Sequence, residues 1–253
     1  MGAKLDNVKS LYLEGIRDGN YLEVFHKFTG DTYIQHSTGV PDGIDGIEAM
    51  FEPFMARYPD RDIQIKRGFE DDNLVFIHVY QSLNNGEAEW VTMDVFKMDD
   101  QDRVIEHWDI IAPFAKNPEN PFGAIDGVIE ISDADKTDQN KATVREFAKQ
   151  VLVGQDFAQW DRFVRDADFV GHDQSGDGSA SAWKQQVHAR RYDTPFHLIG
   201  QGDLVLIYSK VMRNGDDWAE FDLFRLQDDK IVEHWQNGEA IGPSDQWNNS
   251  GKF

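Results

Sequence analysis

Residues 104–108 read Val-Ile-Glu-His-Trp, and residues 231–235 read Ile-Val-Glu-His-Trp. Upstream of each copy lies a second matching stretch, MDVFK around Asp94 and FDLFR around Asp222. Similar stretches in the same order indicate a repeated structural unit. We therefore expect two domains, over residues 1–115 and 137–253. Residues 116–136 contain Pro118 and Pro121 and are predicted to be a linker or wrapping segment.

The spacing of apolar residues predicts the same order of elements in both halves. In the first half, helices are expected over 5–16, 21–28 and 47–58, and strands over 31–36, 63–69, 74–83, 90–98 and 104–111. In the second half, helices are expected over 137–153, 157–164 and 179–190, and strands over 168–172, 196–199, 204–212, 218–226 and 231–235. Asn-Gly pairs at 85–86 and 214–215 predict hairpin turns. This order is typical of an α+β fold.

The composition excludes several classes of function. The 253 residues carry a net charge of −21, which disfavours nucleic acid and anionic membranes as partners. There is no Cys, so disulfides and thiolate nucleophiles are absent. No apolar run is long enough to cross a bilayer, and the first residues lack the apolar core of a secretory signal. A cytoplasmic location is therefore expected.

The motifs YIQHSTGVPDG, MDVFK and RVIEHWD resemble the SnoaL-like polyketide-cyclase branch of the nuclear-transport-factor-2-like superfamily. The second half keeps FVGHDQSGDG, FDLFR and KIVEHW but lacks the Gly-Val-Pro of the loop. The resemblance implies two cone-shaped, cystatin-like domains, each a curved mixed sheet wrapped around about three helices. It also implies a ligand cavity in the cone and pairing through the sheets. The two copies are then expected to form an internal pseudo-dimer, with a further homodimer as a second option.

Two residues are the main candidates for chemistry. By the resemblance, His36 takes the position at which the ketosteroid-isomerase relatives hold a carboxylate base; the alternative is a His that caps the loop. Asp94 lies in an apolar strand, on one face with Trp90, Thr92 and Phe96. A buried carboxylate is costly unless it is hydrogen-bonded or protonated. The resemblance implies an acid that donates to an oxyanion, and the alternative is a pair with His or Arg.

Further candidates are His78 and His107, together with the second-half counterparts His172 and Asp222. The expected ligand contacts are Trp90, Phe96, Trp108, Tyr208 and His234. Each has a purely structural alternative: His78 as a core residue, His107 and His234 in a contact between sheets, and the Trp residues in packing.

Two hypotheses follow. The first is a cofactor-free, polyketide cyclase-like lyase or isomerase that acts on a small apolar carbonyl compound by proton abstraction. Aldol cyclisation, isomerisation and dehydration all belong to this class. The second is a non-catalytic module for ligand binding or assembly, with the second copy structural. No closely spaced metal-ligand pattern is present, so neither a metal nor a cofactor is expected.

Overall fold

The computed structural model describes residues 2–172 and 175–253, which form two compact units. Unit 1 comprises the chain up to Pro113 together with Gly242–Phe253, and unit 2 comprises Phe114–Ile241. The unit boundaries differ from the predicted domain boundaries in two places. The segment predicted as a linker or wrapping segment belongs to unit 2, where Asn120 donates to the carbonyl of Gly171 at 2.9 Å. Residues 242–253, predicted to belong to the second domain, pack on unit 1.

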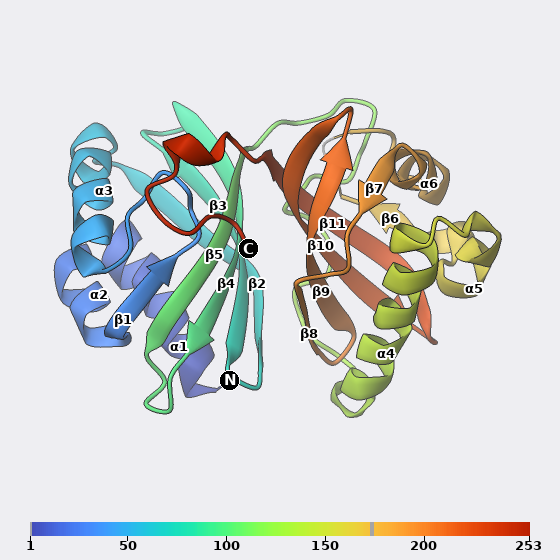
Figure 1. The fold of residues 1–253 in the computed structure, drawn as a ribbon, viewed down its shortest axis with the longest axis horizontal. Coiled ribbons are helices and arrows are strands. Elements are labelled where there is room, and N and C mark those ends of the chain that lie inside the picture. The colour runs from blue at the N-terminus through green and yellow to red at the C-terminus, as the bar shows by residue number, and fades with distance from the viewer. Residues whose placement is uncertain (1, 173–174) are drawn as a thin grey trace. The chain divides into compact units, whose positions relative to one another are not determined.

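Unit 1 is a mixed five-stranded sheet with helices on one face (Figure 1). Its elements are α1 (Ala3–Ser10), η1 (Leu11–Arg17), α2 (Tyr21–Phe28), β1 (Thr29–Gln35), α3 (Ile44–Arg57), β2 (Arg61–Asp71), β3 (Leu74–Leu83), β4 (Ala88–Met98) and β5 (Val104–Pro113). The strand order is β1-β5-β4-β3-β2, in which β1 runs parallel to β5 and the other neighbours are antiparallel. The predicted α+β class and order of elements are confirmed.

Unit 2 repeats this order with shorter outer strands. Its elements are η2 (Ala134–Lys136), α4 (Thr137–Phe147), η3 (Ala148–Val153), η4 (Phe157–Gln159), α5 (Trp160–Phe163), η5 (Asp166–Asp168), β6 (Val170–Gly171), α6 (Ala180–His188), β7 (Arg190–Tyr192), β8 (His197–Gln201), β9 (Leu204–Arg213), β10 (Asp216–Gln227) and β11 (Lys230–Ala240). The sheet order is β6-β11-β10-β9-β7, with β8 also paired to β9. The strand predicted over 168–172 is reduced to β6, and β7 begins where the third helix was expected to continue. Asp173 and Gln174 of the matching loop motif lie outside the described residues.

The predicted hairpin turns form because their residues tolerate positive φ. Asn214 and Gly215, between β9 and β10, have φ of 53° and 94°, as a two-residue type I′ turn requires. Asn84, Asn85 and Gly86, between β3 and β4, have φ of 48°, 58° and 91°. Both turns join strands whose facing residues pair without interruption, so they set the register of each sheet.

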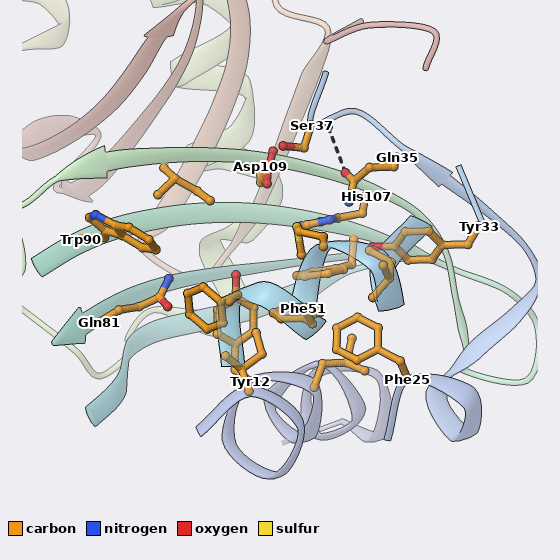
Figure 2. Close-up of a pocket in the computed structure, with 17 residues that line it drawn as sticks. Tyr12, Phe25, Tyr33, Gln35, Ser37, Phe51, Gln81, Trp90, His107 and Asp109 are labelled. Atoms are coloured by element: carbon orange, nitrogen blue, oxygen red, sulfur yellow. Dashed lines mark hydrogen bonds between the residues drawn. The ribbon is translucent and has the colours of Figure 1, made fainter. Parts of the chain in front are cut away.

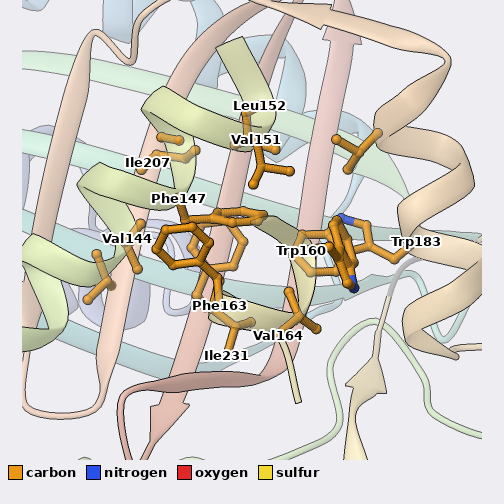
Figure 3. Packing of buried hydrophobic residues seen from close by; sticks show 14 of the residues in the cluster. Val144, Phe147, Val151, Leu152, Trp160, Phe163, Val164, Trp183, Ile207 and Ile231 are labelled. Atoms are coloured by element: carbon orange, nitrogen blue, oxygen red, sulfur yellow. The ribbon is translucent and has the colours of Figure 1, made fainter. Parts of the chain in front are cut away.

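Each unit has its own apolar core between the helices and the sheet. In unit 1 the sheet side of the core includes Val75, Ile77 and Phe96, all fully or almost fully buried. The unit 2 core contains larger aromatic side chains, among them Trp160 and Trp183, whose ring centroids lie 4.8 Å apart (Figure 3). The buried core of unit 2 is therefore built around Trp side chains.

Candidate functional site

A cavity of about 330 Å³ lies in unit 1 between the helices and the sheet (Figure 2). Most of its wall is apolar, and polar groups enter it at a few points, which is typical of small-molecule sites. The apolar lining is Leu11, Ile16, Phe25, Ile47, Met50, Phe51, Phe54, Trp90, Phe96 and Ile111. The polar lining is Tyr12, Tyr33, Gln35, Ser37, Gln81, His107 and Asp109. Trp90 and Phe96, two of the expected ligand contacts, are thus in the wall.

The alternation of side chains along β5 decides which residues face this cavity. His107, Asp109 and Ile111 line it. Glu106 and Trp108 lie between them in sequence and therefore on the opposite face. His107 and Asp109 share one face of β5, as predicted, and Trp108 faces away from the cavity.

Asp94 is the centre of a buried polar group with Tyr12 and His107, called here the Asp94 cluster. The hydroxyl of Tyr12 donates to Asp94 Oδ1 at 2.8 Å, and His107 Nε2 lies 3.0 Å from the same oxygen. The His107 ring stacks on Phe96 with 4.2 Å between centroids, which fixes its plane. Asp94 Oδ2 and His107 Nδ1 have no hydrogen-bond partner among the described residues.

Burial raises the pKa of Asp94, although the hydrogen bond from His107 opposes the rise. The pKa of Tyr12 is also raised, first by burial and then by the nearby charge of Asp94. Asp94 therefore holds a proton more readily than an ordinary aspartate, and Tyr12 keeps its own. The cluster is a set of groups able to donate hydrogen.

Asp109 lies directly opposite Asp94 in the β4–β5 pairing, and its environment acts in the other direction. Burial alone would raise its pKa, but the charges of Lys252 and His107 outweigh burial, and the pKa of Asp109 is lowered. Lys252 Nζ lies 3.3 Å from Asp109 Oδ1 and donates to the Asp109 carbonyl at 2.9 Å. The pKa values of these two carboxyl groups on neighbouring strands therefore shift in opposite directions: that of Asp94 toward the protonated acid and that of Asp109 toward the carboxylate.

The expectation that His36 and Asp94 meet in one cavity is wrong. Gln35 pairs with His107 and faces the cavity, so the next residue, His36, points to the opposite face. There His36 stacks on Trp108 with 4.7 Å between centroids, and its Nε2 lies 3.0 Å from Glu106 Oε1.

The second ring nitrogen of His36, Nδ1, lies 2.5 Å from the carbonyl of Gly251. A carbonyl only accepts hydrogen bonds, so His36 Nδ1 donates to Gly251. The pKa of Glu106 is lowered, because the hydrogen bonds from His36 and Lys97 outweigh its burial. His36 therefore connects β5 to the carbonyl of Gly251, and the contacts of its ring are to these parts of the fold and not to the loop that follows it.

His78 and its counterpart Tyr208 also face away from the helices of their units. His78 pairs in register with Met93, and its Nδ1 accepts from Arg67 Nη1 at 2.8 Å. Tyr208 stacks on Phe221 with 4.4 Å between centroids. The sheet side that carries them is the opposite of the one with the Asp94 cluster. Their predicted roles of orienting or contacting a ligand in the cavity are therefore not supported.

Unit 2 keeps the carboxylate–imidazole pair but fills the space beside it. His234 Nε2 lies 2.8 Å from Asp222 Oδ1, and Gln236 donates to the same oxygen at 2.7 Å. Trp183 lies on the His234 ring with 4.4 Å between centroids, and Arg190 donates to Gln236 at 2.7 Å. Both Asp222 and His234 are thus enclosed by protein side chains.

The helix residues explain this difference. The buried positions 8, 11, 12 and 16 of unit 1 match 144, 147, 148 and 152 of unit 2. Ala148 therefore replaces Tyr12, so Asp222 lacks the phenol donor, while Phe147 replaces Leu11 and adds bulk. His172 repeats the contacts of His36: it lies 2.7 Å from Glu233 Oε1, stacks on Trp235 and contacts the carbonyl of Gly123 at 3.0 Å.

Sequence reasoning missed Tyr12, Gln35 and Gln81 as cavity residues, and gave no role to Lys252. Gln35 carries a usable signal, because it alternates with Tyr33 along the strand predicted over 31–36. The sequence around Lys252 contains no such signal, because no pattern in the neighbouring residues indicates that its side chain is buried. Among the described residues, no group of three or more His, Asp or Glu side chains is placed to hold a metal ion. In the same part of the chain, no helix is long and apolar enough to span a membrane.

The geometry defines a class first: an α+β unit with an apolar cavity and paired carboxyl groups in its sheet. Comparison then finds a family match in its first half. Residues 11–107, which lie within unit 1, match the family model described as the SnoaL-like domain. No curated protein matches the chain.

Solved structures of low sequence identity are similar to part of the chain. IdmH from Streptomyces antibioticus, assigned as a polyketide cyclase, is 18% identical over 44% of this chain and 92% of its own, with a TM-score of 0.37. A protein from Jannaschia sp. CCS1, assigned as a SnoaL-like polyketide cyclase, is 16% identical over 43% and 84%, with a TM-score of 0.38. A protein from Kribbella flavida, assigned as a ketosteroid isomerase, is 11% identical over 43% and 84%, with a TM-score of 0.37.

Proposed function

We propose that unit 1 is a cofactor-free enzyme domain that removes a proton beside a carbonyl group of a small, largely apolar compound. The observation that carries this proposal is the pair Asp94 and Asp109, which are opposite each other on β4 and β5 and whose pKa values shift in opposite directions. An acid and a base held side by side are what enolisation needs. The SnoaL-like match of residues 11–107 supports the same class of chemistry.

Asp109 is the base in this proposal, in place of His36. Its carboxylate is in the cavity wall and accepts the proton from the substrate carbon. A carboxylate of lowered pKa is a weak base, so the substrate C–H bond must be acidified, for example by two flanking carbonyl groups or by a carbonyl and an aromatic ring. This requirement favours a β-dicarbonyl compound, whose enolate can close a ring by aldol addition.

The Asp94 cluster stabilises the enolate oxygen. His107 lines the cavity, and its bond to Asp94 fixes the ring. Tyr12 and Asp94 keep hydrogen available beside it because burial raises the pKa of both. Preorganised donors of this kind stabilise the charge that develops in the transition state.

Unit 2 is assigned a structural role. Trp183 and the Arg190–Gln236 bond occupy the space beside Asp222 and His234. The expected internal pseudo-dimer and the further homodimer stay predictions.

The test uses 2-tetralone, a ring-sized ketone with an activated C–H bond, and follows deuterium exchange from D₂O by proton NMR. The chain should accelerate exchange, and Asp109→Asn should reduce the acceleration by about 10²–10⁴-fold, the usual contribution of a general base. Asp222→Asn, the equivalent change beside the filled space of unit 2, should leave the rate unchanged.

Binding of 2-naphthol, followed by its fluorescence, separates the remaining alternative. Binding in the absence of any exchange would assign unit 1 to the ligand-binding class. Neither binding nor exchange would reject both assignments for this cavity.

A further inference from the structure

We propose that Lys252 is a positioning residue for the cavity of unit 1, where its ammonium group holds Asp109 in place as a carboxylate. The catalytic use of that carboxylate rests on the function proposed above. Lys252 belongs to residues 242–253, called here the closing segment, which follow the last strand of unit 2 but pack on unit 1. One unit of the fold would then be completed by chain that follows the other.

The closing segment is fixed along the loop that leads out of β1. The backbone N–H of Asn248 donates to the carbonyl of Thr38 at 2.9 Å. The side chain of Asn249 donates to the carbonyls of Ser37 and Val40, at 2.7 and 2.8 Å. Ser37 is itself part of the cavity wall, so the segment is held beside the cavity.

The segment then turns inward. Gly251, with φ of 95°, presents its carbonyl to His36 at 2.5 Å. The next side chain, Lys252, is only 4% exposed. A buried ammonium costs free energy unless it is paired and hydrogen-bonded. Its Nζ contacts two atoms of Asp109, the backbone carbonyl and Oδ1.

Unit 2 supplies a comparison inside the same chain. There, Gly123 gives its carbonyl to His172 as Gly251 does to His36, so Ala124 stands where Lys252 stands. Gln236 on β11 stands where Asp109 stands on β5. The cation and the carboxylate are therefore both present in the unit with the cavity and both replaced in the unit whose space is filled. If Lys252 only anchored the closing segment, its presence would not be expected to depend on a carboxylate at position 109.

The experiment is a pH titration of the Asp109 side-chain carboxyl by ¹³C NMR of the full chain labelled at Asp, with Asp109→Asn to assign the resonance. In Lys252→Met, the titration midpoint should rise by about 1–3 pH units, the effect of an opposite charge on a nearby carboxyl. Lys252→Arg keeps the charge and should titrate close to the unmodified chain. Lys116→Met removes one exposed charge from unit 2 and is the matched control.

An unchanged Asp109 midpoint in folded Lys252→Met would overturn the proposal. If near-UV circular dichroism shows that this variant does not fold, Asn249→Ala loosens the segment without removing the charge. A raised midpoint in Asn249→Ala supports the proposal, and an unchanged one overturns it. A raised midpoint without any change in 2-tetralone exchange would support the placement of Lys252 and overturn the function proposed for Asp109.

Discussion

The carboxyl of Asp94 is an ionisable group placed where charge is unfavourable. Its side chain is 1% exposed and receives hydrogen bonds at one oxygen only among the described residues. Its raised pKa means that the folded chain keeps a proton there at a pH at which the unfolded chain has lost it. The ionised form is the form that burial penalises.

A stability prediction follows for Asp94→Asn. As pH rises through the ordinary Asp pKa of about 4, the unfolded state releases this proton first, so the free energy of unfolding decreases until the pH passes the raised folded value. Asn keeps an acceptor oxygen and has no proton to release. Urea unfolding between about pH 4 and pH 7 should therefore show Asp94→Asn gaining stability relative to the unmodified chain. Asp100→Asn, at an exposed position, should run parallel to the unmodified chain, and parallel curves for both variants would contradict the prediction.

The sequence was sufficient to place Asp94 and insufficient to place His36. The face of Asp94 could be predicted because β4 alternates over many residues, so its phase is well defined. His36 lies one residue past the end of β1, where alternation must be counted from a partner strand that the sequence does not specify. A count that is wrong by one residue moves the side chain to the other face. Lys252 depends on a contact between positions distant in the sequence, for which no local pattern exists.

Among the elements, α3 and α6 illustrate how one fold can hold a cavity in one copy and a packed core in the other. Ile47 on α3 lines the cavity, whereas Trp183 on α6 lies against His234 and Trp160. Trp183 is only 1% exposed. Its indole therefore occupies space that a smaller residue would leave open.

Trp183→Ala should open a cavity in unit 2. The loss of a buried Trp side chain is expected to lower the free energy of unfolding by about 3–5 kcal/mol, measured by urea denaturation. Added indole should bind in the vacated space and restore part of the loss, because a ligand that binds only the folded state stabilises it. Phe196→Ala removes a side chain that is 48% exposed, and its effect should be smaller and insensitive to indole. A loss for Trp183→Ala no larger than that for Phe196→Ala would show that the indole does not support the core.

The strands that could be predicted are the long ones. β3, β4 and β5, with β9 and β10, each present a run of alternating or continuous apolar residues. β7, with three residues, was not predicted, and β6 keeps only two residues of the strand predicted over 168–172, because strands this short have no periodicity that defines their bounds. They exist because neighbouring long strands offer them hydrogen bonds, which is a property of the assembled sheet.

At the scale of the whole chain, the closing segment is predicted to stabilise unit 1. A chain that ends at Ile241 loses the contacts of Asn249, Gly251 and Lys252, each hydrogen bond contributing about 1 kcal/mol. Hydrogen–deuterium exchange should then become faster at β5 amides and stay unchanged at β10 and β11. Unaltered protection of β5 would mean that the segment adds nothing to unit 1.

Acid should act on the same contacts. The lowered pKa values of Asp109 and Glu106 stabilise the folded state above their unfolded values, and this contribution is lost as pH falls through the folded values. In the shortened chain the Asp109 part of that loss should disappear, since its cation has been removed.

The segments that follow β5 and β11 each belong to the other unit. The segment after Pro113 is part of unit 2, and the closing segment, residues 242–253, is part of unit 1. A single scission in the chain therefore cannot yield two whole domains, because a fragment that ends at Pro113 lacks the closing segment of unit 1, which remains attached to unit 2. For protein engineers, a self-sufficient SnoaL-like half would need residues 242–253 grafted behind Pro113 in place of the natural continuation. During synthesis on the ribosome, the closing segment is made after unit 2, so the cavity of unit 1 is completed only after the second half has been synthesised.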